Sequence, residues 1–422
     1  MKKPTLETAL MQKQHPTIKF KSNVCFRFYQ FVILLAIAVS FINASNAQII
    51  DSTKMESAYI KTFRSKILGE DRTIFIQTPA RMKATDQYPV LYLLDGESFM
   101  DMAGGQIQYL SESYKIIPSM IIIGIKNTDR FRDLTPTHSI LGSDGKPDSS
   151  INSPFRTSGG GDKFLQFMKE ELMPYIDSNY PTAPYNILFG HSLGGLIVVH
   201  ALVNHPDLFN AYIAVSPSLQ WDQEVMLKMS AEKLGVKKPL NKILFFSDAS
   251  EGTKFHQNQL SFDSLLKQKN IQGLKLKYSY YPEETHISEP VKALYDGIRH
   301  IYPDWHLPYN MSAFRKTMTS KMIINHYVKL SEIYHYTVLP PQDEINQISR
   351  FLANDPMRIN DALELLQMNA KNYPKSGSIF GLMGDVYIKM NDTQNAVASY
   401  QKALILDPGN DSIQQKLRKI QE

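Results

Sequence analysis

Cysteine is almost missing from this chain, because its 422 residues include only Cys25. A single cysteine excludes an internal disulfide framework. No segment predicts a spanning helix either, since the uncharged apolar run 31–42 has twelve residues and such a helix needs about 20. We therefore expect no stable membrane anchor.

An excess of one charge is missing as well, once the first residues are set aside. The formal net charge is +5, but residues 1–47 hold six of the 46 Lys and Arg and only one of the 41 Asp and Glu. The rest of the chain therefore carries 40 side chains of each sign. Such a balanced chain has no electrostatic attraction for nucleic acid, and we expect no nucleic-acid partner.

The same first residues are ordered like an export signal. A basic stretch precedes the run 31–42, and Ser45-Asn46-Ala47 supplies the small residues of a cleavage site. We expect residues 1–47 to be a cleaved signal peptide, so that the mature protein is periplasmic or secreted. Cys25 would leave with it, which excludes a thiol nucleophile. The alternative is a retained anchor.

One short motif indicates the chemistry. The apolar run 187–189 leads into Gly190–Gly194, which has Ser192 at its centre, and an apolar helical stretch follows at once. This strand–turn–helix setting is that of a nucleophile elbow, in which glycines allow the sharp turn that exposes the serine hydroxyl above the sheet. The sequence therefore predicts Ser192 as a nucleophile.

The pattern beyond residue 57 predicts an α/β fold. Strand-like runs lie at 58–67, 72–79, 89–95, 119–126, 186–190, 211–216, 242–247 and 274–281, and helical patterns lie at 163–178, 193–204, 222–234, 257–269 and 288–301. The first two strands should pair antiparallel, and the later ones, with helices between them, should form a mostly parallel sheet. Eight strands with a serine elbow after the fifth fit the α/β-hydrolase fold. The polar segment 127–162 should form the rim of an active site, with Gly159–Gly161 as a hinge or linker.

A serine nucleophile needs a base, and in this fold the order along the chain is serine, acid, histidine. Of the eleven histidines, His286 is the one that lies in a loop directly after the last predicted strand, and we expect it to be the base. The acid should follow the seventh strand, where both Asp248 and Glu251 qualify. One of the two is then expected to cap the loop.

Ester cleavage also needs an oxyanion hole of two backbone N–H donors. One should be the N–H of Leu193, directly after the nucleophile, and the other should come from the loop after the third strand. Gly96 allows that loop to turn towards the serine, which makes the N–H of Glu97 the second expected donor.

Residues 57–303 resemble the putative esterase family that contains esterase D, the enterochelin esterases and the antigen 85 acyltransferases. The segments that carry the resemblance are Tyr92–Gly96, Asn127–Pro136, Gly190–Gly195 and Pro282–His286. The resemblance implies an α/β-hydrolase fold with a serine triad. In that family the acid tends to lie three residues past a small residue that closes the seventh strand, which implies Glu251, although Asp248 stands where members often have glycine.

A helical second part is predicted after residue 303. Residues 377–410 fit one 34-residue tetratricopeptide repeat. The consensus positions hold Phe380, Met383, Gly384, Tyr387, Ala396, Tyr400, Ala403 and Pro408, and Ala362, Leu366 and Pro374 match an earlier, degenerate copy. We expect a helical linker at 304–343 and repeats at 344–420 that bind a protein partner. The alternative is a generic helical hairpin.

No metal or cofactor motif stands out, since neither metal-ligand spacing nor a glycine-rich phosphate loop after a strand occurs. The export signal, the elbow at Ser192 and the base His286 together predict an exported serine esterase that cleaves small carboxylic esters through an acyl-enzyme. Acylated sugars, hydroxycinnamoyl esters and siderophore lactones are candidate substrates. Acyl transfer to a sugar acceptor is one alternative, and an interaction protein with a silent hydrolase fold is another.

Overall fold

An eight-stranded sheet organises the first part of the chain. A computed structural model describes residues 58–142, 145–235, 239–307 and 317–422. The strands are β1 (Tyr59–Arg64), β2 (Asp71–Gln77), β3 (Tyr88–Leu93), β4 (Ile121–Ile125), β5 (Thr182–His191), β6 (Ala211–Val215), β7 (Lys242–Ala249) and β8 (Leu274–Tyr281), in the spatial order β1-β2-β4-β3-β5-β6-β7-β8. β2 pairs antiparallel with both β1 and β4, and every other pair is parallel. The predicted α/β-hydrolase sheet is confirmed.

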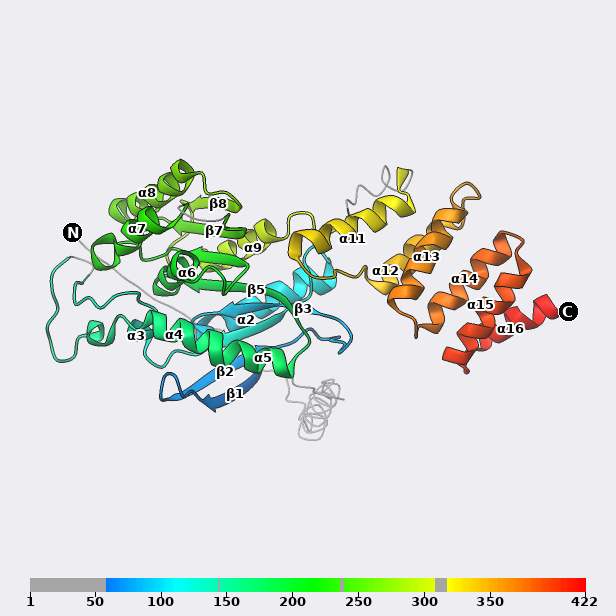
Figure 1. Ribbon diagram of the computed structural model, residues 1–422, viewed down its shortest axis with the longest axis horizontal. Helices are drawn as coiled ribbons and strands as arrows, with labels where there is room; N and C mark the ends of the chain where they lie inside the picture. The colour runs from blue at the N-terminus through cyan, green and yellow to red at the C-terminus, as the bar shows by residue number, and fades with distance from the viewer. Residues whose placement is uncertain (1–57, 143–144, 236–238, 308–316) are drawn as a thin grey trace, which may run out of the picture. The chain divides into compact units, whose positions relative to one another are not determined.

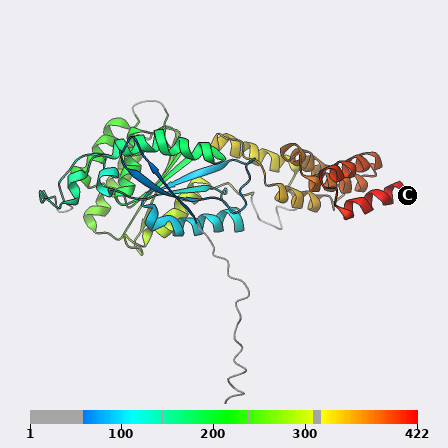
Figure 2. The ribbon, with the colours of Figure 1, turned by 90° about the horizontal axis from the view of Figure 1, so that it is seen from below.

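Helices cover both faces of this sheet (Figures 1 and 2). On one face lie α2 (Gly96–Gln108) and α9 (Glu289–Ile301). On the other lie α4 (Gly161–Phe167), a π-helical turn (Met168–Leu172), α5 (Met173–Asn179), α6 (Leu193–Asn204), α7 (Trp221–Lys233) and α8 (Thr253–Lys269). Successive strand side chains point to opposite faces, so that Ile187 packs with α2 and α9 whereas Leu188 packs with the second layer. The buried strands therefore contribute to two cores.

One helix of this layer, α2, was not predicted. Its interior holds Gly104 and Gly105, and glycine is a poor helix former. The helix forms because Met100, Ala103 and Ile107 bury their side chains against the sheet. Tertiary packing therefore outweighs weak local propensity here.

The expected signal peptide at 1–47 lies outside the described residues. Among the residues that the structure describes, no helix is both long and apolar enough to cross a membrane.

The second part is entirely helical in its described residues. It comprises α11 (Ser320–Tyr334), α12 (Gln342–Leu352), α13 (Ile359–Asn372), α14 (Gly377–Lys389), α15 (Thr393–Leu406) and α16 (Asp411–Gln421). From α12 onward each helix packs against the next one along the chain. Gly384 on α14 lies so close to the Tyr400 ring on α15 that a Cβ atom would collide with it. This small–large contact fits the tetratricopeptide repeat, which stays a prediction.

Aromatic side chains join the two parts through one continuous core. The Tyr334 ring on α11 packs edge-on against Tyr185 at the start of β5, with ring centroids 5.3 Å apart, and lies 4.9 Å from the Tyr302 ring after α9. The Tyr334 hydroxyl also donates to the carbonyl of Ile301 at 2.9 Å. Helix α11 is therefore packed onto the sheet domain and does not serve only as a spacer.

Candidate active site

The predicted elbow has the geometry that its glycines suggest. β5 ends at His191, α6 begins at Leu193, and Ser192 between them has φ 61° and ψ −115°. This left-handed backbone costs a residue with a side chain of order 1–3 kcal/mol, and such strain is concentrated at functional sites. A Cβ atom on Gly190 would collide with the carbonyl of Gly194. The turn therefore requires glycine where the sequence has it.

The Ser192 hydroxyl is half-buried and faces a second serine. Its Oγ lies 3.4 Å from the Oγ of Ser218, which follows β6. The backbone of Ser192 is fixed from two sides, because its N–H donates to Val215 and its carbonyl accepts from Ser218. The hydroxyl therefore stands on a rigid support at the carboxyl end of the sheet.

His286 and Glu251 meet beside this elbow. The His286 Nδ1–H donates to Glu251 Oε2 at 2.6 Å, and the Glu251 side chain is only 8% exposed. The His286 ring lies 4.3 Å from the ring of His191, the residue before Ser192. With Nδ1 bound to a carboxylate, Nε2 is the nitrogen left to exchange a proton with a substrate or nucleophile.

The other candidate acid, Asp248, binds a different histidine. Its Oδ2 accepts from His256 Nδ1 at 2.7 Å and its Oδ1 accepts from the Tyr278 hydroxyl at 2.5 Å. Burial raises the pKa of Asp248, while these two hydrogen bonds act in the opposite direction. One of the two acids was expected to cap the loop, and the structure shows Asp248 joining α8 to β8.

Two residues that the sequence did not single out stand behind Glu251. Ser216, which follows β6, touches both Glu251 Oε1 and Glu289 Oε2 with its hydroxyl oxygen. Glu289 is the first residue of α9 and is fully buried. Burial, assisted by repulsion from Glu251 and Asp248, raises the pKa of Glu289 to about 7. A polar residue at the carboxyl end of a buried parallel strand, as Ser216 is, was the available signal.

The loop after β3 is tied to the elbow by an arginine. The buried Asp95, with φ 52°, precedes α2 and accepts from Arg130 Nε at 2.6 Å and Nη2 at 3.0 Å. The same Nη2 donates to the carbonyl of His191 at 3.2 Å. Asn127 Nδ2 donates to Asp95 at 2.5 Å. Arg130 therefore fixes the distance between the loop after β3 and the backbone that carries Ser192.

The two expected oxyanion donors both lie in the first turn of a helix. Leu193 is the first residue of α6, and Glu97 is the second residue of α2. The first N–H groups of a helix have no partner within the helix and lie at its positive end. A Cβ atom on Gly96 would lie 2.6 Å from the backbone of Gly124, so only glycine allows this approach of α2 to the sheet.

His191 is buried in this site but remains neutral. Burial, followed by repulsion from His286, lowers the pKa of His191 to about 4. Its ring packs edge-on against Phe99, and its Nε2 has no hydrogen-bond partner among the described residues. His191 therefore provides a packing surface for His286 and carries no charge at neutral pH.

The segment 127–162 is held more tightly than the expected hinge would allow. A Cβ atom on Gly159 would collide with the backbone of His138, and one on Gly161 would lie 2.6 Å from Ile197 Cδ1. The interpretation of Gly159–Gly161 as a hinge or linker is therefore wrong, because these glycines are close-packing positions. Within the segment, Phe131 and Phe155 pack against Trp221.

One group of described residues has the donor types of a metal site. Asp162 Oδ1 lies 2.7 Å from His200 Nε2 and 2.8 Å from His205 Nε2. However, Asn204 Nδ2 donates to His200 Nδ1, and Lys233 donates to the Asn204 oxygen. His200 Nε2 must therefore carry the proton that it donates to Asp162, which leaves no lone pair for a metal. The hydrogen bonds explain this cluster without an ion.

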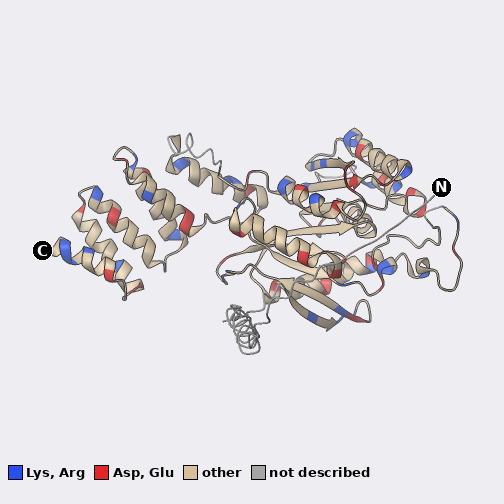
Figure 3. Ribbon diagram, turned by 180° about the vertical axis from the view of Figure 1, so that it is seen from behind, with Lys and Arg blue, Asp and Glu red and all other residues tan. Residues whose placement is uncertain are grey.

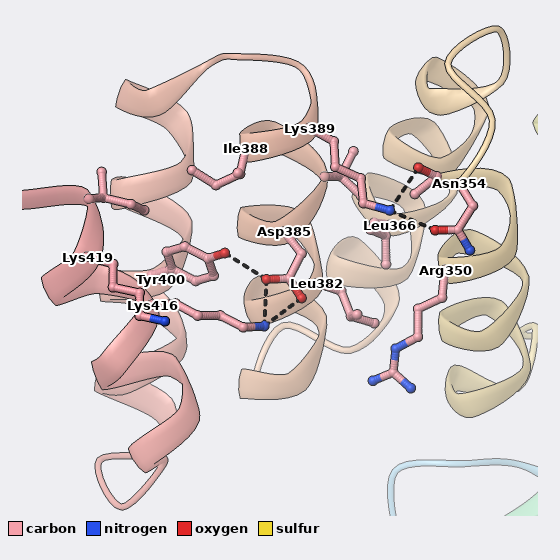
Figure 4. Close-up of a pocket in the computed structure, with 13 residues that line it drawn as sticks. Arg350, Asn354, Leu366, Leu382, Asp385, Ile388, Lys389, Tyr400, Lys416 and Lys419 are labelled. Carbon is pink, nitrogen blue, oxygen red and sulfur yellow. Dashed lines mark hydrogen bonds and ion pairs between the residues drawn. The ribbon is translucent and has the colours of Figure 1, made fainter.

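A cavity of about 600 Å³ lies between α12, α14 and α16 (Figure 4). Its wall combines apolar side chains with four cations, namely Arg350, Lys389, Lys416 and Lys419. Lys416 pairs with Asp385 at 2.7 Å, whereas the Arg350 and Lys419 side chains make no hydrogen bond or ion pair with other described residues. Elsewhere in the described chain basic and acidic residues are interspersed (Figure 3), so this concentration of cations is local.

Comparison with known proteins shows that the chain resembles esterases. The family model described as "Putative esterase" matches residues 65–276. The chain is 30% identical over 238 residues to ferri-bacillibactin esterase BesA of Bacillus subtilis, which covers 52% of this chain and 81% of that protein. It is 35% identical over 155 residues to the siderophore enterobactin esterase of Emericella nidulans, and the match covers 32% of this chain and 48% of that protein. Ser192 and Glu251 lie within the residues that the family model matches, and His286 follows them.

Solved structures show the same fold. An IroE-like serine hydrolase from Shewanella oneidensis is 32% identical, with a TM-score of 0.64, and covers 75% of this chain and 99% of that one. An uncharacterised protein from Capnocytophaga ochracea covers 86% of this chain and 99% of its own, with a TM-score of 0.61. At 16% identity this second likeness shows the fold alone.

Proposed function

The chain belongs to the Putative esterase family and is a carboxylic ester hydrolase, and from this premise we propose that Ser192, His286 and Glu251 form its catalytic triad. The observation that carries the proposal is the 2.6 Å hydrogen bond from His286 Nδ1 to Glu251, made by a histidine packed against the elbow. The strained backbone of Ser192 supports it independently. Glu251 orients the ring, and Nε2 then serves Ser192.

The reaction follows from these roles. Ser192 Oγ attacks the ester carbonyl carbon while His286 Nε2 takes the hydroxyl proton, and Glu251 stabilises the imidazolium that results. The carbon–oxygen bond to the alcohol then breaks, and His286 returns the proton to the leaving oxygen. Water, deprotonated by the same nitrogen, attacks the acyl carbon, the bond to Ser192 Oγ breaks, and His286 returns the proton to that oxygen as the acid leaves.

The oxyanion is stabilised by the N–H groups of Leu193 and Glu97, which lie at the starts of α6 and α2. Donors held in advance at the developing negative charge are each worth about 2.7–4 kcal/mol in enzymes of this kind. Arg130 supports this arrangement, because it joins Asp95 to the elbow.

We propose siderophore-type esters as the substrates. Relatives named as esterases of ferri-bacillibactin, enterobactin, triacetylfusarinine C and apo-salmochelin support this choice over acylated sugars or hydroxycinnamoyl esters. The exposure of the His286 side chain, 38%, fits an open site that admits a bulky ester. The basic stretch and small-residue cleavage site before Gln48 support export of the mature enzyme.

We also propose that the cavity between α12, α14 and α16 binds a protein segment with acidic and apolar side chains. Arg350 and Lys419 are available for carboxylates, beside an apolar wall that includes Leu382. A labelled peptide of alternating Glu and Leu is expected to bind the intact chain and to bind the Arg350→Glu variant more weakly. Equal binding by the two proteins would remove this role from the cavity.

A substrate panel tests the proposed enzyme activity. Wild-type protein and the Ser192→Ala variant are assayed on a cyclic catecholate ester, a feruloyl ester, an acetylated sugar and a short-chain nitrophenyl ester. We expect preferential turnover of the catecholate ester and a loss of several orders of magnitude in the variant. Turnover of the sugar ester in preference to the others would contradict the substrate, and an active variant would contradict the triad.

A further inference from the structure

One hydroxyl in this structure contacts two carboxyl groups. Ser216 Oγ lies at hydrogen-bond distance from Glu251 Oε1 and from Glu289 Oε2. Ser216 is fully buried, and its backbone has φ 41°, a conformation that costs a residue with a side chain free energy. The hydroxyl is therefore held in place between the two acids by its backbone as well as by its contacts.

The Ser216 hydroxyl has too few hydrogens to donate to both carboxyl groups. A serine hydroxyl has one hydrogen to donate, and an ionised carboxylate can only accept. If Glu251 and Glu289 were both ionised, one of the two contacts would bring two oxygens together without a hydrogen between them. One of the acids must therefore be protonated for both contacts to be hydrogen bonds.

The surroundings indicate that the proton is on Glu289. Glu251 Oε2 already accepts the Nδ1–H of His286, so Glu251 acts as an acceptor in this network. Glu289 is fully buried and forms no ion pair with any described residue, and the hydroxyls beside its carboxyl group are those of Ser216 and Ser247. A buried carboxylate in such a setting is far more costly than a neutral carboxyl group.

We propose that Glu289 is a protonated positioning residue, which donates to Ser216 so that Ser216 donates to Glu251 and holds the orienting acid of His286. The inference rests on the proposed triad, because it assigns Glu289 a role through Glu251. The chain of donors runs from α9 through the end of β6 to the loop after β7. Glu289 touches neither the substrate nor the reacting atoms.

Ionisation of Glu289 would break this chain. The groups that face it are the hydroxyls of Ser216 after β6 and Ser247 on β7, the acids Asp248 and Glu251 from β7 and its loop, and Tyr281 from β8, and no cation is among them. As the pH rises through the pKa of Glu289, about 7, the second carboxylate competes for the single Ser216 proton. The wild-type enzyme should therefore lose kcat on the alkaline side while KM stays nearly constant.

Two substitutions at Glu289 separate this role from packing. Glu289→Gln retains a donor for Ser216 but cannot ionise, whereas Glu289→Leu fills the space without a donor. We expect Glu289→Leu to lower kcat at pH 6 by up to about a hundredfold, because misplacement of a catalytic group has an effect of that size. Glu289→Gln should retain most of the wild-type kcat at pH 6 and should lack the alkaline decline. Glu283→Gln, an exposed acid paired with Lys292, is the matched control and should follow the wild-type profile.

Infrared difference spectroscopy on the full chain gives a readout that does not depend on turnover. We expect a protonated carboxyl band at pH 6 that disappears at pH 9 and is absent from Glu289→Gln at either pH. A missing band at pH 6, or identical alkaline profiles for wild type and Glu289→Gln, would overturn the inference. If Ser192→Ala retains activity, the proposed triad fails instead, and the band still reports the protonation of Glu289.

Discussion

Arg130 holds Asp95 through two hydrogen bonds, from Nε at 2.6 Å and from Nη2 at 3.0 Å. Because Nη2 also reaches the carbonyl of His191, one guanidinium connects the start of α2 to the residue before the nucleophile. The same side chain therefore holds the backbone at the start of both helices that offer oxyanion donors. The planar guanidinium presents several N–H donors in fixed directions, so it can bind Asp95 and the His191 carbonyl together. The single ammonium group of a lysine cannot make the same set of hydrogen bonds.

Arg130→Lys should therefore lower kcat by about ten- to a hundredfold with a smaller change in KM, since the charge remains but the two helices lose their common support. Steady-state kinetics on a soluble ester measures the effect. Arg64→Lys is the control, because the Arg64–Asp71 pair is exposed on both sides. An Arg130→Lys enzyme with wild-type kcat would show that the loop after β3 holds its position without the ion pair.

The two acids after β7 should behave differently on amidation. Glu251→Gln is expected to lower kcat by about two to four orders of magnitude, because an amide does not stabilise the imidazolium or fix the tautomer. Asp248→Asn should change kcat little and lower the melting temperature, because Asp248 joins His256 to Tyr278. Measuring kcat and melting temperature for both variants decides between them. A severe rate loss confined to Asp248→Asn would reverse the assignment.

A chain that ends at Asp304 should retain kcat on a small ester, since every proposed catalytic residue lies before that point. It should be less stable, because loss of α11 exposes Tyr185 and Tyr302, and exposing a large apolar side chain costs about 1.5–3 kcal/mol. Thermal unfolding and single-turnover kinetics on the purified protein test both statements. A folded but inactive shortened chain would mean that the helices help to build the site.

Glu289 should make stability depend on pH. Its pKa is raised from 4.5 to about 7, so the folded chain binds more protons than the unfolded chain between these values. Its contribution is therefore complete below about pH 4.5 and is lost as the pH rises through about 7. The difference in stability between Glu289→Gln and wild type should consequently shift in favour of Glu289→Gln when the pH is raised from 5 to 8. Parallel melting curves of the two proteins across this range would contradict the raised pKa.

The sequence predicted all eight strands because each is a short stretch, either continuously apolar or alternating between apolar and polar residues, and both patterns are local signals. It missed α2, whose glycines hide a helix that only packing against the sheet stabilises. The elbow could be predicted for the same local reason. The sharp turn at Ser192 requires glycine at Gly190, where a Cβ atom would collide with the carbonyl of Gly194, so the glycine is visible in the sequence as part of the motif.

The supporting residues were harder to predict because they come from distant segments. Arg130 lies in a segment that was recognised by resemblance, but its bond to Asp95 is a tertiary contact. Ser216 and Glu289 are separated from Glu251 by 35 and 38 residues, and no spacing rule connects them. His256, the hydrogen-bond partner of Asp248, lies in a stretch whose sequence pattern predicts an ordinary helix. Burial and proton counting, which need coordinates, assign these residues their roles.

The most direct measurement is the site of covalent labelling by a fluorophosphonate, which reacts preferentially with an activated serine. Purified wild-type protein, Ser192→Ala and His286→Ala are treated in parallel, digested and examined by peptide mass spectrometry. We expect the phosphonate on Ser192 in the wild type, no label in Ser192→Ala, and labelling slowed by orders of magnitude in His286→Ala. Labelling of Ser218 or Ser216 in place of Ser192, or an unchanged rate without His286, would contradict the proposed triad.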